Sequence, residues 1–491
     1  MNVSIIRYIL GSVLKACAIF LLLPCIVAVV YRENVGVYYL LTAVLCFAVG
    51  CVLSVKKAET RTSFLLKEGC VATALSWILM SLIGCLPFYF SGEIPSFTDA
   101  LFEAISGFST TGASILSDIE ALSYTALFWR SFTHWIGGMG VLVFLLAVVP
   151  LSGGSNINLM KAESTGPSVG KLMPNIKTTA RILYTIYLGL TVIEILMLIF
   201  GGCPVFDSVT LGFSTAGTGG FSIKNDSLAG YSSYVQWVVA IFMILFGVNF
   251  NAYFFIISKK IMKAFSMEEV RTYFAIITAA VVIITINIFN MYDSAAVAIK
   301  DATFQVASLI SSTGCATTNY DLWPETSKTV LIFVMFIGAC AGSTGGGMKV
   351  SRVIILIKSF SKEIISYIHP KSIRKIKLDD KTVPHDVVRS TNVYFLTLIM
   401  IFCVSVFLIT FENKDSITNF TAVLACINNM GPGLASVGPV CNFSHFGDFS
   451  KYVFMFDMLA GRLELFPMLI LFQPAVIKAL TIGNIKKKKI D

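Results

Sequence analysis

The stretch SSTGCATTNY, residues 311–320, lies between two long apolar segments. It is too polar to cross a membrane and too short to form a soluble domain. Comparable polar stretches containing glycine occur three more times, and each follows an apolar segment that is too short to span. These four short segments cover about 95–110, 203–216, 297–312 and 416–429. The chain therefore repeats one unusual combination, a non-spanning segment followed by a polar loop.

The repetition is visible in the residues themselves. The four copies read FEAISGFSTTGAS, FDSVTLGFSTAGTGG, FQVASLISSTGCATTN and FTAVLACINNMGPGLAS. Alignment on Gly112, Gly217, Gly314 and Gly431 places a phenylalanine about ten residues upstream of each glycine. The glycines are roughly a hundred residues apart, which indicates an internal repeat.

Composition identifies the class of protein. The 491 residues are 56% hydrophobic and 13% charged, and the mean hydropathy is +0.80. These values indicate a polytopic membrane protein. Ten apolar segments have the length of a membrane span, near 5–30, 36–55, 69–91, 125–150, 180–201, 233–258, 271–291, 328–358, 388–411 and 450–481.

Lysine and arginine indicate the orientation of these spans. With ten spans, twenty-nine of the 37 basic residues fall on one side of the membrane. Cytoplasmic loops are enriched in these residues, so both termini are expected in the cytoplasm. All four polar loops then enter from the outer face, as parallel copies that can surround one axis.

The predicted fold is an all-α polytopic membrane protein with two N-terminal transmembrane helices and four parallel pseudo-repeats. Each repeat consists of a helix, a pore helix, a filter loop and a second helix around one central pore. The predicted units are 1–67 for the N-terminal helices, then the repeats 68–160, 161–265, 266–365 and 366–491.

Four such loops on one axis predict an ion filter. Non-helical backbone at membrane depth is tolerated where it is buried in protein or lines water. Carbonyl oxygens of such loops can replace the hydration shell of a cation, and glycine permits the backbone angles this requires. The loops carry no carboxylates, which favours a monovalent ion over Ca²⁺ or Mg²⁺. The alternative is that the glycines only let helices pack closely.

The chain resembles the TrkH/TrkG family, the potassium-translocating subunit of the Trk system, in a superfamily with KtrB and the plant HKT transporters. The resemblance covers essentially the whole length. The motifs that carry it are FSTTGAS, FSTAGTGGFS, SSTGCATTNY, CINNMGPGLASVG, RSFTHWIGGMG, AGSTGGGMKVSR and MLAGRLELFP. A serine at the position of Gly112 accompanies sodium transport in some plant relatives, so Gly112 favours potassium.

The resemblance implies which residues bind K⁺. The expected K⁺ filter consists of Thr111, Gly112, Ala216, Gly217, Thr313, Gly314, Met430 and Gly431. The expected flanking residues are Thr110, Thr215, Ser312 and Asn429. K⁺ is expected as the transported ion at these residues, and no bound cofactor is expected.

A gate is expected within the span 328–358. Three consecutive glycines there each cost a helix about 1 kcal/mol relative to alanine, so the helix should open. By resemblance the gate consists of Gly342, Ser343, Thr344, Gly345, Gly346, Gly347 and Arg462. A nucleotide-binding interpretation of GSTGGGMK is rejected because Met348 stands where a P-loop has lysine. Arg462 either opposes a cation or has a structural role, as an ion pair with Glu464 or Asp457 or a cap on loop carbonyls.

The remaining expectations concern partners and alternatives. By resemblance the protein is a homodimer in the bacterial inner membrane, in contact with lipid and regulated by a cytosolic TrkA-type ring that binds the nucleotide; no nucleic acid is expected. His134 and Glu194 are interpreted as structural polar residues. One alternative, a Na⁺- or H⁺-coupled cation symporter, predicts inverted repeats. A second, an intramembrane enzyme, would need convergent ionisable residues.

Overall fold

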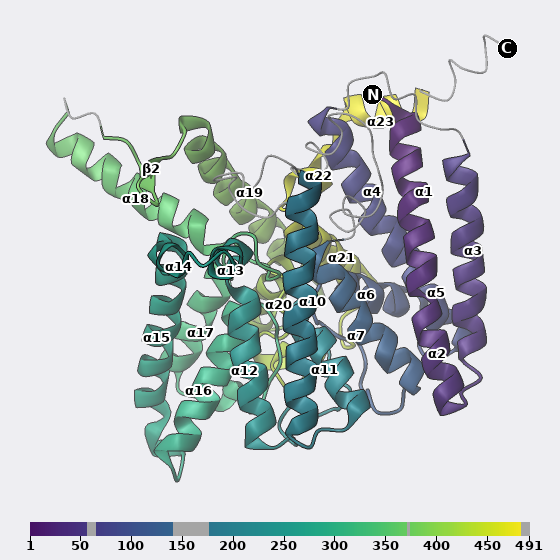
Figure 1. Cartoon of the computed structure of the whole chain (residues 1–491). Coiled ribbons are helices and arrows are strands. Elements are labelled where there is room, and N and C mark those ends of the chain that lie inside the picture. Colours follow the sequence, from purple (N-terminus) through teal and green to yellow (C-terminus); the bar gives the residue numbers. More distant parts are fainter. Residues whose placement is uncertain (56–64, 141–175, 371–373, 483–491) are drawn as a thin grey trace.

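We analysed a computed structural model of the chain, which describes residues 1–55, 65–140, 176–370 and 374–482. The described residues are almost entirely helical (Figure 1), with one two-stranded antiparallel hairpin, β1 (Lys377–Leu378) and β2 (Lys381–Thr382). The start of α1 and the last helix, α23, lie at the same upper end of the molecule in Figure 1. The all-α expectation is therefore confirmed.

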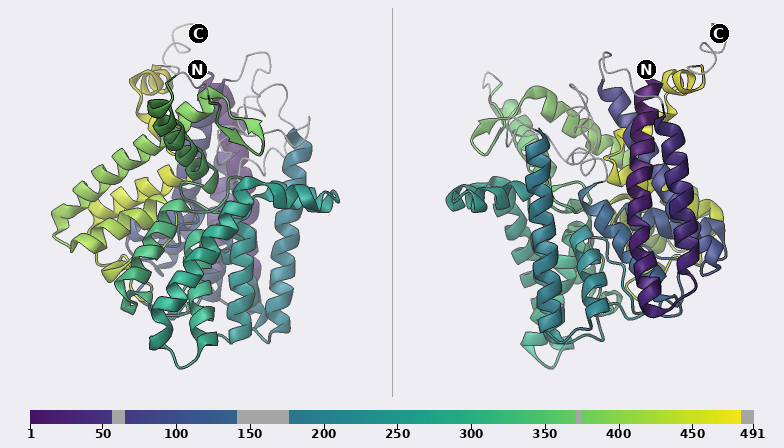
Figure 2. Two further views of the ribbon diagram at one scale, coloured as in Figure 1. Left: turned by 90° about the vertical axis from the view of Figure 1, so that its left-hand side faces the viewer. Right: turned by 45° about the vertical axis from the view of Figure 1, so that its right-hand side comes forward.

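Three helices at the N-terminus stand beside the rest of the molecule (Figure 2). They are α1 (Val3–Phe20), α2 (Leu22–Tyr31) and α3 (Gly36–Ser54). The first two together form one apolar segment of 29 residues. Where α1 meets α3, a Cβ on Gly50 would lie 2.9 Å from the carbonyl oxygen of Gly11. Glycine at both positions lets the two backbones approach closely.

Four units follow, and each begins with a long apolar helix. In the first unit this helix is α4 (Leu66–Gly84), continued by α5 (Leu86–Ser91). Its counterparts are α10 (Ile176–Phe200), α15 (Glu268–Ile288) with the short helix η1 (Phe289–Met291), and α19 (His385–Ile409) with η3 (Thr410–Glu412).

The second element of each unit is a shorter, largely buried helix. These pore helices are α6 (Phe97–Phe108), α11 (Val205–Gly217), α16 (Ala295–Ile310) and α20 (Ser416–Ile427). Three begin at side-chain caps, since Ser96, Ser294 and Asp415 each accept a hydrogen bond from a backbone amide of the first turn. Two short helices follow the loops after them, η2 (Tyr320–Leu322) and η4 (Ala435–Val437).

The helix after each pore helix is shorter than a full membrane span. The sequence predicted such a break in only one unit. These helices are α7 (Tyr124–Met139), α12 (Ser233–Gly247), α17 (Glu325–Ile337) and α21 (Asp448–Arg462). Beyond Gly247 the chain turns by 93° into α13 (Phe250–Ile257). Later pieces are α14 (Ile261–Ser266), α18 (Val350–Ile368), α22 (Phe466–Leu469), η5 (Ile470–Phe472) and α23 (Pro474–Ile482).

These breaks change the count of membrane spans. The described residues contain six helices that are long and apolar enough to cross a membrane, or seven if the bent pair α12 and α13 counts as one. The predicted spans 328–358 and 450–481 instead consist of shorter helices. The second half of the predicted span 125–150 and the unit boundary at 160 lie outside the described residues. Three other predicted boundaries, at 67, 265 and 365, fall inside α4, α14 and α18.

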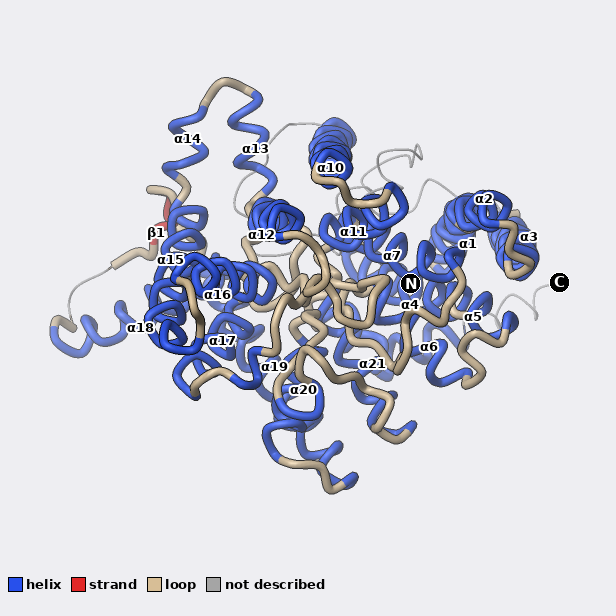
Figure 3. Tube along the Cα trace, turned by 90° about the horizontal axis from the view of Figure 1, so that it is seen from below, coloured by secondary structure: helices blue, strands red, loops and turns tan. Residues whose placement is uncertain are grey.

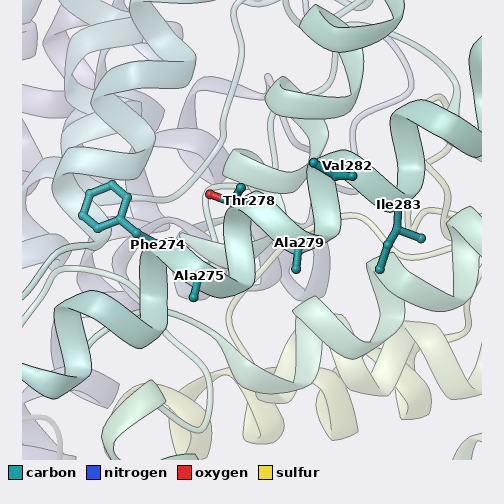
Figure 4. A pocket seen from close by; sticks show the side chains of 6 residues that line it. All are labelled: Phe274, Ala275, Thr278, Ala279, Val282 and Ile283. Carbon is teal, nitrogen blue, oxygen red and sulfur yellow. The ribbon is translucent and has the colours of Figure 1, made fainter.

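Many large apolar side chains on the outer helices are exposed, as on α3, where Leu41, Val44 and Phe47 are each more than half exposed. Such a surface suits contact with lipid. A shallow hollow on α15 belongs to this surface (Figure 4), because its six lining side chains, from Phe274 to Ile283, all come from that one helix. It is open and lacks a charged group, so it is not a candidate site.

The contact between α1 and α3 gives a first prediction. Gly50→Leu should lower the free energy of unfolding by about 1 to 3 kcal/mol, because a large side chain must separate the two helices. Gly189→Leu is the matched control, since a Cβ at Gly189 in α10 would meet no atom within 4 Å. Thermal unfolding in detergent measures both variants, and equal midpoints would contradict the packing argument.

Candidate functional site

The four loops that follow the pore helices share one backbone conformation. In each loop a residue with left-handed φ comes first, with values of 55°, 54°, 60° and 53° at Thr110, Thr218, Ser312 and Asn429. Two residues later a glycine is also left-handed, with φ of 80°, 81°, 83° and 79° at Gly112, Gly220, Gly314 and Gly431. A side chain is strained at such angles, so the second position requires glycine.

A hydrogen bond at the end of each pore helix repeats as well. The amide of the residue before each glycine donates to the carbonyl five residues upstream. The pairs are Thr111 N to Ser106 O (2.9 Å), Gly219 N to Ser214 O (2.9 Å), Thr313 N to Ser308 O (2.8 Å) and Met430 N to Ala425 O (2.9 Å). The four loops are thus equivalent residue by residue.

This equivalence corrects the sequence alignment in the second loop. Thr215, Ala216 and Gly217 lie inside α11, whose last residue is Gly217, and the position of Gly112 is taken by Gly220. The alignment was misled because Phe213-Ser214-Thr215 repeats the letters of Phe108-Ser109-Thr110. Gly217 serves a different purpose, since a Cβ there would collide with the carbonyl of His134 on α7.

The four loops touch in cyclic order. A Cβ on Gly112 would collide with the carbonyl oxygen of Gly219, and one on Gly220 with that of Thr313. A Cβ on Gly314 would likewise collide with the carbonyl oxygen of Met430. The ring closes at Gly431, where a Cβ would lie 2.9 Å from the carbonyl oxygen of Thr111. Figure 3 shows the loops gathered at the centre of the molecule with helices around them.

A cavity of about 230 Å³ lies against this ring. All four glycines line it, together with residues that follow the first, second and fourth loops, including Ser114, Ser222 and Pro432. Among the described residues, no cluster of three or more His, Cys, Asp or Glu side chains could hold a metal ion. The groups of the site that can contact an ion are therefore backbone carbonyls and hydroxyls.

Hydroxyl groups brace the loops from within. The Thr111 hydroxyl lies 2.7 Å from that of Ser109, and the Thr313 hydroxyl lies 2.7 Å from that of Ser311. The Asn429 amide donates to the Thr111 hydroxyl at 3.0 Å, which joins the fourth loop to the first. All of these residues are fully buried or nearly so. They fix the positions of the carbonyls rather than forming an outer mouth.

A buried ion pair that the sequence did not predict supports two of the loops. Arg130 on α7 and Glu103 on α6 form a salt bridge of 2.7 Å, and both side chains are at most 1% exposed. Arg130 also donates to the carbonyl of Ser222 at 3.1 Å, while Glu103 accepts from the amide of Ile115 at 3.1 Å. The pair thus holds the segments just after Gly112 and Gly220. The sequence does contain a signal for such a pair, namely an arginine inside a predicted span and a glutamate inside a short apolar segment.

His134 performs a similar structural role, as the sequence suggested. Its Nδ1 lies 2.8 Å from the carbonyl oxygen of Gly107, and its Nε2 accepts from the amide of Phe221 at 3.2 Å. Both ring nitrogens are therefore occupied by backbone groups. Glu194 is fully buried in α10. Cys203 and Cys441, on the same side of the molecule, are both free thiols.

The expected gate residues 342–347 form a loop between α17 and α18 that contacts the second, third and fourth units. The Thr344 hydroxyl donates to the carbonyl of Phe246 in the second unit at 3.2 Å. The amide of Gly346 donates to the Ser312 hydroxyl, and a Cβ on Gly346 would lie 2.5 Å from the Asn428 carbonyl oxygen. The loop therefore lies directly against the pore-helix ends of the third and fourth units.

Arg462, the last residue of α21, ties this loop to the first unit. Its guanidinium donates to the carbonyl of Thr344 at 2.9 Å and to that of Gly138 at 2.8 Å, and also to the carbonyl of Gly137. It thus caps loop carbonyls, which was one of the roles considered. Glu464 bonds Arg352 on α18, and Asp457 accepts from Ser405 at 2.8 Å.

Glu269 on α15 anchors the start and end of the same loop, a role the sequence gave no reason to expect. Its carboxylate accepts from the amides of Ala341 (2.6 Å) and Ser351 (3.1 Å), and from the side chain of Asn249 (2.9 Å). Asn249 lies at the bend between α12 and α13. The carboxylate therefore couples the two broken helices of the second and third units.

The buried ion pair gives the prediction for the site. Glu103→Gln should lower the free energy of unfolding by about 3 to 5 kcal/mol, because it leaves the buried Arg130 guanidinium without its counter-charge. Glu325→Gln is the control, since Glu325 also pairs with a basic residue but its side chain is 86% exposed, so its loss should cost under about 1 kcal/mol. Similar unfolding midpoints for the two variants would contradict this assignment.

Comparisons with known proteins agree with this geometry. The TrkH family model, described as cation transport protein, matches residues 38–477. The Trk system potassium uptake protein TrkH of Salmonella typhimurium is 35% identical over 482 residues, which cover 96% of this chain and 99% of that protein. An uncharacterized cation transporter of Methanocaldococcus jannaschii is 33% identical and covers 97% of this chain and 96% of its own length.

A solved structure extends the similarity to the fold. The crystal structure of the potassium transporter TrkH from Vibrio parahaemolyticus matches with a TM-score of 0.86 at 30% identity, covering 97% of this chain and 100% of that one. This chain is thus a multi-pass membrane protein of the TrkH family of cation transport proteins, a family of transporters rather than enzymes.

Proposed function

We propose that the protein takes up potassium through the ring of four loops. The observation that carries the proposal is the closed cycle of contacts between each glycine and the carbonyl of the next loop. In this proposal the residues of the filter are Thr111, Gly112, Gly219, Gly220, Thr313, Gly314, Met430 and Gly431. The residues that flank it are Thr110, Thr218, Ser312 and Asn429.

The electrostatics of the pore helices support a cation as the substrate. All four pore helices end immediately before the ring, so the negative ends of their dipoles face it. Carbonyl oxygens in place of carboxylates suit a monovalent ion. Potassium is favoured because the curated relatives from Salmonella and Escherichia coli are named potassium uptake proteins.

The driving force needs no chemical step in this chain. A membrane potential supplies about 2.3 kcal/mol per elementary charge per 100 mV, which moves a cation inward. The four units are parallel, whereas alternating access around a midplane site is typically built on inverted repeats. We therefore favour a gated pore over a Na⁺- or H⁺-coupled symporter.

The loop 342–347 is proposed as the gate of this pore. It touches residues of the second, third and fourth units on the side of the ring opposite the 230 Å³ cavity, and Arg462 links it to the first unit. Its displacement would therefore be needed to open a path. The helix α18 follows it directly and carries basic residues towards the upper end of the molecule. We propose that a cytosolic TrkA-type ring binds nucleotide and acts on α18.

We further propose that the protein sits in the bacterial inner membrane as a homodimer. The upper end in Figure 1, which carries the start of α1 and α23, would then face the cytoplasm. This orientation is supported by the excess of lysine and arginine in the segments assigned to that side.

The filter is tested by serine substitutions in proteoliposomes, with radioactive rubidium uptake measured against competing K⁺ or Na⁺. Gly220→Ser and Gly314→Ser should each reduce the preference for K⁺ over Na⁺ about tenfold or more. A side chain at either left-handed position would displace the carbonyl oxygen of the next loop.

Gly217→Ser is the matched control for register. It should lower stability through its collision with α7 while the protein that remains folded keeps the wild-type selectivity. A selectivity change in Gly217→Ser with none in Gly220→Ser would overturn the corrected register. Unchanged selectivity in both Gly220→Ser and Gly314→Ser would overturn the filter.

The gate is tested at Arg462. Arg462→Met removes the hydrogen bonds that hold the Thr344, Gly137 and Gly138 carbonyls together. Hydrogen bonds from a charged donor contribute about 1.5 to 3 kcal/mol, so basal rubidium flux without a regulatory partner should rise about tenfold. Arg389→Gln, at an exposed position of α19, is the control. A folded Arg462→Met variant with wild-type or lower basal flux would contradict the gating assignment.

A further inference from the structure

Two basic side chains line the cavity against the glycine ring, and one of them forms an ion pair. These residues are Arg130 and Lys224. Glu103 compensates Arg130 at 2.7 Å. None of the ion pairs formed by the described residues includes Lys224, whose ammonium instead lies 3.9 Å from the centre of the Tyr231 ring. An aromatic face attracts a cation without cancelling its charge.

The position of Lys224 is fixed by its surroundings. Its amide donates to the Ser222 hydroxyl at 3.1 Å, and its carbonyl accepts from Ser227 at 3.2 Å. Tyr231, on which the ammonium rests, donates its hydroxyl to Asp207 at 2.8 Å. The lysine is therefore held at the cavity wall, four residues beyond Gly220.

Two carboxylates at the rim of the cavity form hydrogen bonds with Asn225. Asp118 accepts from the Asn225 side chain at 2.8 Å, and Glu120 accepts from the Asn225 amide at 3.0 Å. Both acidic residues lie on the exposed rim of the cavity, beside Ile119 in its wall. A cation that enters the cavity thus passes the carboxylates of the rim and Lys224 in the wall.

We propose that Lys224 excludes divalent cations from the cavity in front of the filter. The repulsion energy between the Lys224 charge and a divalent ion is twice that between the same charge and a monovalent ion at the same place. The cavity therefore binds K⁺ weakly enough for it to move on into the ring, and it binds Mg²⁺ or Ca²⁺ far more weakly still. Conduction requires such moderate binding. The inference rests on the proposed function, because it assigns this cavity to the cation pathway.

The linear dependence on ionic charge makes the proposal quantitative. If neutralising Lys224 tightens monovalent binding by a given factor, divalent binding should tighten by the square of that factor. Coulomb interaction across a water-filled cavity of this size suggests a factor of about two to five for the monovalent ion. The corresponding factor for a divalent ion is then about four to twenty-five. A purely steric role for the side chain would not produce this relation.

The test uses the full-length protein in proteoliposomes, with rubidium uptake measured at several external concentrations of rubidium and of Mg²⁺ or Ca²⁺. In Lys224→Gln the KM for rubidium should fall about two- to fivefold, and the maximal rate should fall because the ion leaves the cavity more slowly. The divalent inhibition constant should fall by the square of the factor found for the KM. Lys224→Arg should behave as wild type.

Lys328→Gln serves as the matched control, because Lys328 pairs with Glu325 at the start of α17 and does not line the cavity. A membrane-impermeant maleimide at Cys441, an exposed thiol in the cavity wall, counts the molecules whose cavity faces outward in each preparation. Lys328→Gln should leave divalent inhibition unchanged, and the labelling is done on a separate sample of each preparation.

The outcomes separate the inference from the function it rests on. Wild-type vesicles that take up no rubidium would overturn the proposed function itself. Active vesicles in which Lys224→Gln keeps the wild-type divalent inhibition constant would overturn only the role of Lys224. Equal tightening for monovalent and divalent ions would also overturn it, because a charge effect must scale with ionic charge.

Discussion

The contact between a glycine Cα and the carbonyl of the neighbouring loop, repeated four times, is the constraint on which the structure depends. Each contact is too close for a side chain, and each glycine has a left-handed φ that a side chain would strain. Because the contacts form a cycle, none can relax without displacing the next. The ring therefore needs all four units in register, which explains why one chain carries four copies of the unit.

The rest of each unit can be understood as support for this ring. The pore helices approach from the lower side and end at it, and the second helices stop after only 13 to 16 residues. At α12 the turn of 93° is fixed from outside the helix, because the amides of Cys340 and Phe250 bond the carbonyls of Gly247 and Gly342. Backbone groups freed by one broken helix are satisfied by another.

Sequence reasoning recovered the features that repeat and missed those that depend on tertiary contact. Repetition indicated the four units and the positions of three of the four left-handed loop glycines, and the resemblance of seven motifs indicated the family. The second loop failed because it contains Gly217, Gly219 and Gly220, and letters do not reveal which glycine has a positive φ. The break after Gly247 was hidden because the residues beyond it remain apolar. The ion pair of Arg130 and Glu103 was not predicted, because a single sequence does not show that the two side chains meet.

Three basic side chains near the ring show how position decides what a charge does beside the proposed cation path. Arg130 is buried beside the ring, but Glu103 cancels its charge, so it acts through the backbone it holds. Arg462 lies on the opposite side of the ring, where its guanidinium caps carbonyls of the gate loop and of the first unit. Its guanidinium there holds the loop against the first unit.

Lys224 differs from both, because an aromatic ring holds it and none of the described carboxylates pairs with it. A bare positive charge beside a cation pathway would be selected against if the only requirement were tight binding. Transport imposes a second requirement, that the ion leave the cavity as readily as it arrives. A fixed monovalent charge meets that requirement for K⁺ while penalising a divalent ion twice as strongly, so the same residue adjusts both throughput and discrimination.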